Sequence, residues 1–359
     1  MSSTRRDVLR WTGGLGLAAL GGCLGSAHRD DASADRSVSS DDESLPPTTE
    51  RPLYLGHGLE SLRNNVVSGG VSKDGIPSID RPVFSAADAS SLGDGDPVFG
   101  LVRNGDARAY PQRVLVWHEI VNDSVGGDPV AVTYCPLTGT AQGFERGPAE
   151  FGVSGRLVNS NLVMYDRATD SRWPQMLATA IEGALEGESL HEFRLVWTTW
   201  KNWRDAYPNT RVLTEQTGYS RRYGDDPYGR YNPDSGYYAN TQLLFDPLSE
   251  DTRANPKTVV LGVRTAHGAL AFEKTSLLEN RVLEGELAGE RFVAVADPAL
   301  ETGYVYVADA DVDVEPNAAG YDVDGEFARA NELPLGRSLA FDAMWFAWAG
   351  FYPETNYVV

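Results

Sequence analysis

Cysteine is nearly absent from this sequence. Its 359 residues contain only Cys23 and Cys135. We expect Cys23 to be modified by lipid, for reasons given below, so one thiol would remain in the folded part and a disulfide within the mature chain is excluded. An unpaired thiol on the oxidising side of a membrane is either buried and inert or kept for reactivity or metal binding.

Basic residues are scarce as well. The chain has 31 Lys and Arg against 51 Asp and Glu, a formal net charge of −20, and the acidic residues are spread along its length. Such a surface repels phosphates, which argues against a nucleic-acid partner. Dispersed acidic charge is typical of proteins from salt-adapted organisms, where salt screens the repulsion.

Long hydrophobic runs are missing too. The longest apolar stretch, from Trp11 to Gly22, is Gly-rich and too short to span a bilayer. It follows the pair Arg5-Arg6 and leads into Leu20-Gly21-Gly22-Cys23, an order that predicts a twin-arginine signal peptide ending in a lipobox. We therefore expect removal of residues 1–22 and anchoring of lipidated Cys23 at the extracellular face of the cell membrane. The alternative is an uncleaved anchor with a chance cysteine.

Few apolar residues occur between Cys23 and Glu50, where Ser, Asp and Pro dominate. Residues 23–50 are therefore expected to form a disordered tether. We expect residues 51–250 to form a first β-rich unit, and residues 251–359 to form a second, degenerate one.

Helical periodicity is rare, whereas short Val, Leu, Tyr and Phe runs between turn residues are common. Asn104-Gly105 predicts a hairpin turn, because both central positions need a positive φ. A helix is predicted at Thr198 to Tyr207, where Trp residues recur every third position before Pro208, and a second at Pro174 to Glu186.

An internal repeat emerges at an offset of 162 residues, which places Val98, Gly100 and Tyr110 on Val260, Gly262 and Phe272. With a one-residue slip, the run ending in Cys135 then resembles the run ending in Asp297. The sequence thus predicts a mainly β protein with a few short helices (α+β). Its two related β units would form one large domain or two closely packed ones. Two similar meanders that align by chance are the alternative.

The most distinctive sequence motifs lie between Tyr110 and Gln175. It comprises Trp117-His118-Glu119-Ile120-Val121-Asn122-Asp123, Thr133-Tyr134-Cys135-Pro136-Leu137-Thr138-Gly139-Thr140-Ala141, Asn159-Ser160-Asn161-Leu162-Val163-Met164-Tyr165-Asp166-Arg167 and Trp173-Pro174-Gln175. Together with Phe346-Ala347-Trp348-Ala349-Gly350-Phe351-Tyr352-Pro353, these segments resemble a prokaryotic family catalogued as domain of unknown function 3179. The resemblance runs from about Gly69 to Pro353 and names no reaction. Many members of that family have a second cysteine where this chain has Thr138, which argues against a two-thiol mechanism here.

Three kinds of function remain open. The first is a thiol-dependent enzyme, in which His118 activates Cys135 and Asp123, Asn122 or Glu119 orients the imidazole. In this hypothesis, the Thr138-Gly139-Thr140 turn would present backbone N–H groups to an oxyanion.

The second hypothesis is a metal-binding or electron-transfer protein. His118, Cys135 and Met164 are soft ligands of the kind that suits copper, with His57, His191 or His267 as a further imidazole. The sequence identifies neither the metal nor any other cofactor.

The third hypothesis is a non-catalytic surface domain that binds a small-molecule or surface ligand. Cys135 and His118 would then be core side chains, and Asn159, Asn161, Tyr165 and Arg167 would line the ligand site. Arg156, Arg167 and Arg172 are candidates for clamping a carboxylate or phosphate. Because Pro136 cannot continue a central strand, we also expect Cys135 at a strand end, at the edge of a pocket, with His118 as its nearest imidazole.

Overall fold

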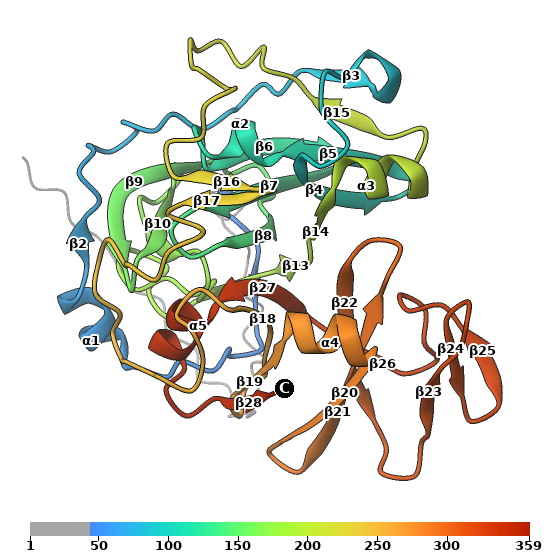
Figure 1. Ribbon diagram of the computed structural model, residues 1–359. Helices are drawn as coiled ribbons and strands as arrows, with labels where there is room; N and C mark the ends of the chain where they lie inside the picture. The colour runs from blue at the N-terminus through green and yellow to red at the C-terminus, as the bar shows by residue number, and fades with distance from the viewer. Residues whose placement is uncertain (1–43) are drawn as a thin grey trace, which may run out of the picture. The chain divides into compact units, whose positions relative to one another are not determined.

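The structure is a computed structural model that describes residues 44–359 (Figure 1). The predicted signal peptide, Cys23 and most of the tether lie outside the described residues. The last tether residues are ordered: Thr48–Thr49 form strand β1, which pairs with β12 (Ser189–Leu190). In the described part of the chain, no helix has the length and apolar character needed to cross a membrane.

The first repeat, residues 97–213, forms two sheets with strand orders β14-β4-β5-β15 and β13-β8-β7-β6, and β3, which precedes the repeat in the chain, adds a further strand beside β15. All neighbouring strands are antiparallel except β15 and β5. The bounds are β3 Phe84–Ala86, β4 Pro97–Arg103, β5 Asp106–Pro111, α2 Gln112–Leu115, β6 Ile120–Val125, β7 Asp128–Cys135, β8 Thr140–Glu145, β13 Glu192–Phe193, β14 Val196–Thr199, α3 Trp200–Ala206 and β15 Arg211–Leu213; the 3₁₀ turn Ala87–Ala89 follows β3.

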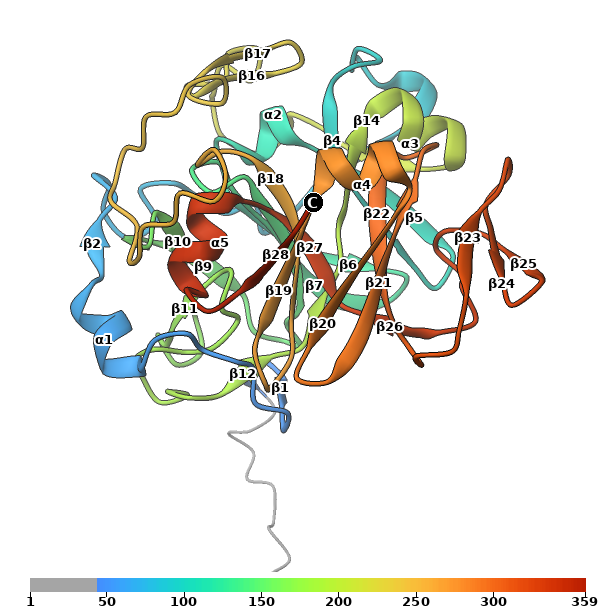
Figure 2. The ribbon, with the colours of Figure 1, turned by 60° about the horizontal axis from the view of Figure 1, so that its bottom comes forward.

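The second repeat, residues 259–358, has the same two sheets, with strand orders β27-β18-β19-β28 and β26-β22-β21-β20 (Figure 2). Again the first sheet contains one parallel pair, here β19 and β28, and β28 is the edge strand. The bounds are β18 Val259–Arg264, β19 Ala269–Glu273, α4 Lys274–Asn280, β20 Val282–Leu287, β21 Glu290–Asp297, β22 Thr302–Ala308, β26 Gly336–Ser338, β27 Ala340–Met344, α5 Trp345–Phe351 and β28 Asn356–Val358.

The strand pairing confirms the mainly β fold with two related units. The offset of 162 residues holds from β4 through β8, so the slip expected before Cys135 is wrong. Strands β7 and β21 have the same length and end at Cys135 and Asp297. Each terminal residue pairs with the matching position of the next strand, Cys135 with Thr140 and Asp297 with Thr302.

Both repeats pack a tryptophan onto a glycine of the first strand. Trp203 of α3 lies over Gly100, and Trp348 of α5 lies over Gly262; a Cβ on either glycine would approach the indole to 2.1 or 2.2 Å. The indole N–H of each tryptophan donates to a threonine seven residues on, Thr210 or Thr355, at 2.9 and 3.0 Å. Helix α3 confirms the helix predicted at 198–207, and the antiparallel pairing of β4 with β5 confirms the hairpin predicted at Asn104-Gly105.

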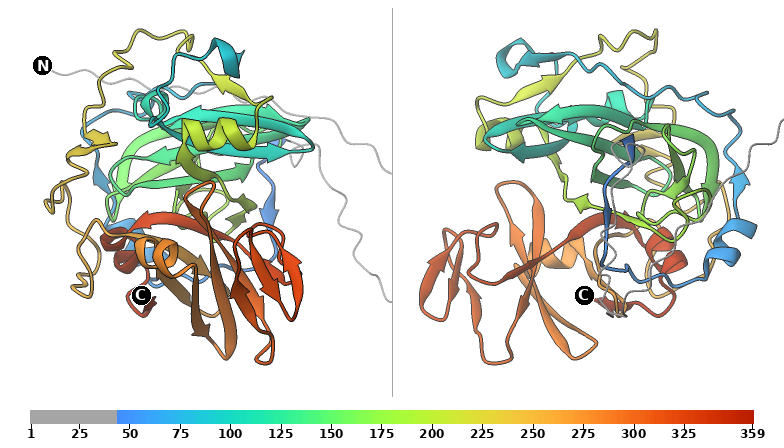
Figure 3. Two further views of the ribbon diagram at one scale, coloured as in Figure 1. Left: turned by 45° about the vertical axis from the view of Figure 1, so that its right-hand side comes forward. Right: turned by 180° about the vertical axis from the view of Figure 1, so that it is seen from behind.

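Each repeat carries its own insertion before its last strands. The first insertion forms β9–β12, and β9 also pairs with β2, which, like α1, precedes the repeat in the chain. The second insertion forms a three-stranded sheet, β23–β25, that packs on β21 and β22 (Figure 3). Their bounds are α1 Leu59–Asn64, β2 Val67–Ser68, β9 Phe151–Val158, β10 Asn161–Asp166, β11 Arg172–Pro174, β23 Val314–Pro316, β24 Tyr321–Val323 and β25 Glu326–Ala328.

The helix predicted at 174–186 is wrong. After β11, the backbone turns back on itself, with Ala178 at φ +52°, and Ile181 N–H donates to Arg172 O at 2.8 Å. Met176 and Ile181, whose spacing suggested a helix face, are both buried in the core under β9 and β10. Tertiary burial rather than helical periodicity explains their spacing.

A connecting segment, residues 214–258, joins the repeats. Its only regular structure is the hairpin of β16 (Gly229–Tyr231) and β17 (Asp234–Gly236). The segment packs Tyr228, Tyr231, Tyr237 and Tyr238, here called the tyrosine cap, beside Tyr134 near the end of β7.

Candidate functional site

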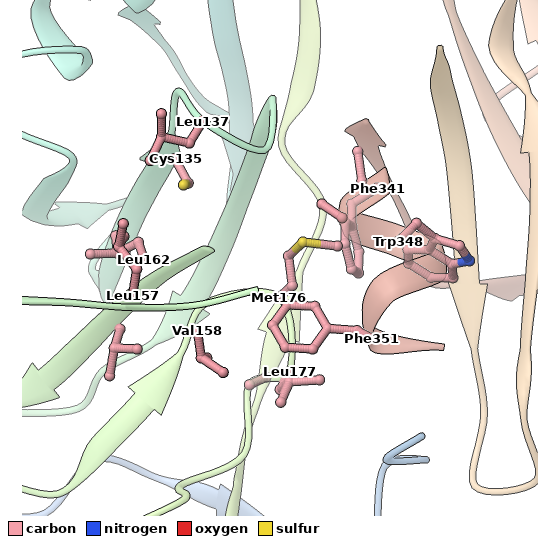
Figure 4. Close-up of a cluster of buried hydrophobic side chains, with 14 of the residues drawn as sticks. Cys135, Leu137, Leu157, Val158, Leu162, Met176, Leu177, Phe341, Trp348 and Phe351 are labelled. Carbon is pink, nitrogen blue, oxygen red and sulfur yellow. The ribbon is translucent and has the colours of Figure 1, made fainter. Parts of the chain in front are cut away.

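The Cys135 thiol is enclosed by apolar side chains. Figure 4 shows it in the cluster that also contains Leu137, Leu157 and Leu162, and the residue is 1 % exposed. Its Sγ–H donates to Ser160 O at 3.7 Å. Burial, and then the negative charge of Glu119, raise the pKa of Cys135 to about 11. Cys135 lies at a strand end as expected, but the expected position at a pocket edge is wrong, because the connecting segment and the β9–β10 turn cover it.

His118 is a fully buried ring whose two nitrogens both have partners in the protein. Nδ1 lies 2.7 Å from Pro77 O, a pure acceptor, so Nδ1 carries the proton and Nε2 accepts from the Tyr223 hydroxyl at 2.8 Å. Burial lowers the pKa of His118, which favours this neutral form. Among residues 44–359 no hydrogen bond joins this ring to Cys135. His118 therefore links Tyr223 of the connecting segment to Pro77, and its ring nitrogens are both used in these contacts.

Asp123 and Asn122 form hydrogen bonds with residues other than His118. Asp123 accepts from both Arg108 Nη1, at 3.1 Å, and the Tyr110 hydroxyl, at 2.6 Å. Asn122 donates to Asp80 at 2.8 Å and to Phe151 O at 2.9 Å. Neither residue orients the imidazole.

Glu119 is the polar residue that the sequence reasoning undervalued. It has a left-handed backbone, φ +58°, its side chain is 7 % exposed, and no hydrogen bond or ion pair of its carboxyl group occurs in the described chain. Burial raises the pKa of Glu119 to about 8. Its charge acts on both Cys135 and Tyr228, so the three groups are neighbours under the tyrosine cap. In the sequence, it was only one of several acidic residues near His118.

A chain of buried polar side chains begins beside Cys135. Asn161 Nδ2 donates to Thr138 Oγ1 at 3.1 Å and to Gln175 Oε1 at 3.0 Å. Gln175 Nε2 in turn donates to Thr133 Oγ1 at 2.9 Å. Asn161, predicted to bind a ligand, is fully buried and uses its amide within the protein.

The polar chain ends in a buried ion pair between the repeats. Gln142, next to Thr133 in the sheet, donates to Glu192 of β13, and Glu192 pairs with Arg264 of β18 at 2.5 Å. Arg264 also donates to the Tyr352 hydroxyl at 2.6 Å. Both charged side chains are almost completely buried, so this pair ties the two repeats together.

The other predicted ligand residues are distributed over the fold and paired there. Asn159 donates to Ala347 O of α5 at 2.7 Å, Tyr165 donates to Asp74 at 2.7 Å, and Arg167 pairs with Asp80 at 2.8 Å and with Glu150. Arg156 and Arg172 line a cavity of 490 Å³ with Lys73, whereas Arg167 lines a different cavity. The three arginines therefore do not form one clamp.

The predicted metal ligands do not come together in one described cluster. Met164 is a buried core residue, and His57 Nε2 lies 2.8 Å from Gly350 O, whereas the His118 nitrogens contact Pro77 and Tyr223. His191 and His267 are exposed. In residues 44–359 no group of three or more His, Cys, Asp or Glu side chains is arranged to hold a metal ion.

A cavity of 540 Å³ lies between the two repeats, a size that suits a small organic ligand. One wall is formed by β4, β13 and β14 of the first repeat. The other is formed by β22 and β26 of the second, with Asn331 and Leu339 beside β26. Unlike Cys135, this space is open to solvent.

The family comparison agrees with the resemblance seen in the sequence. The family model described as "Protein of unknown function (DUF3179)" matches residues 73–355. The chain belongs to this family. No curated protein and no solved structure matches it.

Proposed function

We propose that this member of the DUF3179 family is a ligand-binding protein, held at the outer face of the cell membrane by lipid on Cys23, with its ligand site in the cavity between the repeats. One contrast carries the proposal. Cys135 and His118 are buried and hydrogen-bonded within the protein, whereas the cavity between the repeats is open to solvent. Ligand sites commonly occur where two structural units meet.

Several features of the Cys135 region support a non-catalytic function. A thiol whose pKa is about 11 is almost entirely protonated at neutral pH and is a poor nucleophile. The ring of His118, its expected base, is bonded to Pro77 and Tyr223. The motif residues Thr138 and Gln175 both accept hydrogen bonds from Asn161, so these polar groups are used within the core.

A cavity-filling variant tests the proposal. Ser338 of β26 lines the cavity, and Ser338→Phe should occupy much of its volume. A panel of small carboxylates, phosphates, amines and sugars would be titrated into both proteins, with melting temperature as the readout, since ligand at 100 times Kd adds about 2.7 kcal/mol to stability. Compounds that stabilise the natural protein and not the variant support the proposal. Compounds that stabilise both equally, or a panel without any effect, contradict it.

A lipid anchor is tested separately. Cys23→Ser should release the protein into the medium or leave the signal uncleaved. Unchanged membrane retention together with unchanged lipid labelling would contradict anchoring through this residue.

Glu119 supports a second candidate function, that of a thiol-dependent enzyme with a different base. Groups with strongly shifted pKa values are concentrated at functional sites, and burial raises the pKa of Glu119, which acts on the Cys135 thiol, to about 8. In this alternative, Glu119 takes the proton of Cys135 once the tyrosine cap moves away. Alkylation of Cys135 in the native protein distinguishes the two functions. A rate that rises with an apparent pKa near 8, and that falls in Glu119→Gln, favours the enzyme; a thiol that reacts only after unfolding favours the binding protein.

A further inference from the structure

The cavity between the repeats has an unusual charge for this protein. Its lining contains three arginines, Arg103, Arg194 and Arg337, and no Asp or Glu. Four other cavities of the described chain each include at least one carboxylate, contributed by Glu301, Asp297, Glu182 or Asp80. The chain has 51 acidic and 31 basic residues. A cavity whose only charged lining residues are cations therefore concentrates positive potential in a protein whose net charge is negative.

Arg337 is the most available of these cations. It is exposed on β26, and its guanidinium lies 4.5 Å from the ring centre of Tyr304. No hydrogen bond or ion pair to this guanidinium occurs in the described chain. Stacking on a tyrosine holds the planar group in place while its donors remain unused, which suits a two-point contact with a carboxylate or phosphate.

Arg194 faces the same tyrosine from the first repeat, 5.2 Å from the ring centre. It donates to Ala340 O at 2.7 Å and to Thr302 Oγ1 at 2.6 Å, both neutral acceptors, and its Nε has no partner. Burial lowers the pKa of Arg194, so its charged form lacks full compensation. An anion bound beside it would supply that compensation.

The carboxylate that acts on Arg194 and those that pair with Arg103 are already engaged. Asp342, whose charge acts on Arg194, is buried and pairs with Lys274 at 2.8 Å. Arg103 pairs with Asp128 at 3.3 Å and Glu145 at 3.1 Å, and stacks on Phe193. Arg103 therefore shapes the wall, and the uncompensated charge comes from Arg194 and Arg337.

The remaining lining is apolar and aromatic. It contains Leu101, Phe193, Trp203, Tyr207 and Tyr304, and the polar side chains of Asn331 and Ser338. Such a wall favours a ligand with a flat apolar body, which stacks on tyrosine at little entropic cost.

We infer that the cavity between the repeats binds a small organic anion, with its carboxylate or phosphate held by Arg337 and Arg194 beside Tyr304 and its apolar body against Phe193 and Tyr207. This inference rests on the proposed function and specifies its ligand class.

The test uses benzoate, phenyl phosphate and uncharged benzyl alcohol, titrated by calorimetry into the full-length protein with the same salt throughout. At least one of the two anions should bind, and benzyl alcohol should bind at least tenfold more weakly. Arg337→Gln should weaken anion binding about 10- to 100-fold, the usual effect of losing a charge-assisted contact. Arg337→Lys keeps the positive charge but loses the planar guanidinium group. Its anion affinity should therefore lie between that of the natural protein and that of Arg337→Gln. Comparison of benzoate with phenyl phosphate identifies the charged group.

Arg156→Gln is the matched control, because Arg156 lines a different cavity and its guanidinium also has no partner in the described chain. It should leave anion binding unchanged. Equal losses in Arg337→Gln and Arg156→Gln would show nonspecific attraction and overturn the inference. Benzyl alcohol binding as tightly as the anions, with sensitivity to Ser338→Phe, would overturn the anion class while leaving the proposed function intact. If other compounds of the panel occupy the cavity but neither anion binds, the anion class is likewise overturned and the proposed function stands.

Discussion

The two repeats place different chemistry on the same backbone. Glu119 and Arg281 occur at matching positions, both with a left-handed conformation, φ +58° and +69°, directly before a strand. Both carbonyl groups accept the N–H of the matching strand residue, Tyr134 at 2.8 Å and Ala296 at 2.9 Å. Yet the carboxyl group of Glu119 has no partner, whereas Arg281 donates to Asn317 O and Gly320 O.

The ends of the matching strands differ in the same way. Cys135 is enclosed, whereas Asp297 is partly exposed and accepts from the N–H groups of Ala299 and Leu300 at 3.1 and 3.3 Å. The repeated fold therefore fixes where these residues lie along the strand. Their chemistry depends on what covers the strand end. The connecting segment covers Cys135, whereas Asp297 is in contact with solvent.

Exchange of the two strand-end residues tests that comparison most strongly. Cys135→Asp should destabilise the protein by at least about 4 kcal/mol, because it places a carboxyl group without partners in an apolar cluster. Asp297→Cys should cost about 1 kcal/mol, since it removes only two turn hydrogen bonds. Urea unfolding of both variants gives the values. Cys135→Ala, expected to cost about 1–3 kcal/mol, separates lost packing from added charge; equal effects of Asp and Ala at position 135 would show that the site is not apolar.

The buried ion pair between the repeats should matter far more than a surface pair within one of them. Glu192→Gln should destabilise the protein by about 3–5 kcal/mol, because it leaves Arg264 buried without a charged partner. Glu284→Gln, which breaks an exposed pair with Arg291, should cost at most about 1 kcal/mol. Chemical denaturation measures both.

The double variant Glu192→Leu with Arg264→Met is the control for the ion pair. It should recover much of the lost stability, because no buried charge remains. A double variant no more stable than Glu192→Gln would show that the hydrogen bonds around the pair, rather than its charges, hold the repeats together.

The glycine–tryptophan contacts should be equally intolerant of change in the two repeats. Gly100→Ala and Gly262→Ala should each cost about 1–3 kcal/mol, because the new methyl group overlaps the Trp203 or Trp348 ring. Thermal unfolding with Gly58→Ala as control, where the added Cβ meets no atom within 4 Å, measures the effect. A large difference between the two repeats would mean that one tryptophan can move aside.

Glu119 should make stability depend on pH, and its counterpart Arg281 should not. Since burial raises the pKa of Glu119 to about 8, the folded protein holds this proton more tightly than the unfolded chain does. The stabilisation is complete below the unfolded pKa and is lost as pH rises towards 8, with a slope of up to about 1.4 kcal/mol per pH unit. Unfolding free energies between pH 5 and 8 should show this trend in the natural protein and a smaller one in Glu119→Gln. Parallel pH curves would place the carboxyl group in contact with water.

Some of this architecture could be read from local patterns. Alternating Val and Tyr runs, Asn104-Gly105 and the Trp spacing before Pro208 predicted strands, a hairpin and a helix, because each depends on neighbours in the chain. The offset of 162 residues predicted the repeat from Gly100 and Gly262, whose lack of a side chain is required by the tryptophans above them.

The environment of the site residues could not be predicted in this way. His118 and Cys135 were interpreted as partners because they lie on neighbouring segments of the sequence. In the structure, the His118 imidazole contacts Tyr223 instead, and the Cys135 thiol is buried in the core. Tyr223 lies 105 residues from His118, a pairing that no local pattern indicates.

The sequence by itself determined the strand-rich fold, its duplication, the place of Cys135 at a strand end and the negative charge of the chain, since these follow from local preferences and composition. Only the tertiary structure decided that the thiol is buried, that Glu119 has no partner and that Arg194 and Arg337 meet in a cavity without carboxylates. Burial and pairing depend on which distant segments pack together, and two residues 143 positions apart in the chain become neighbours only when both repeats have folded.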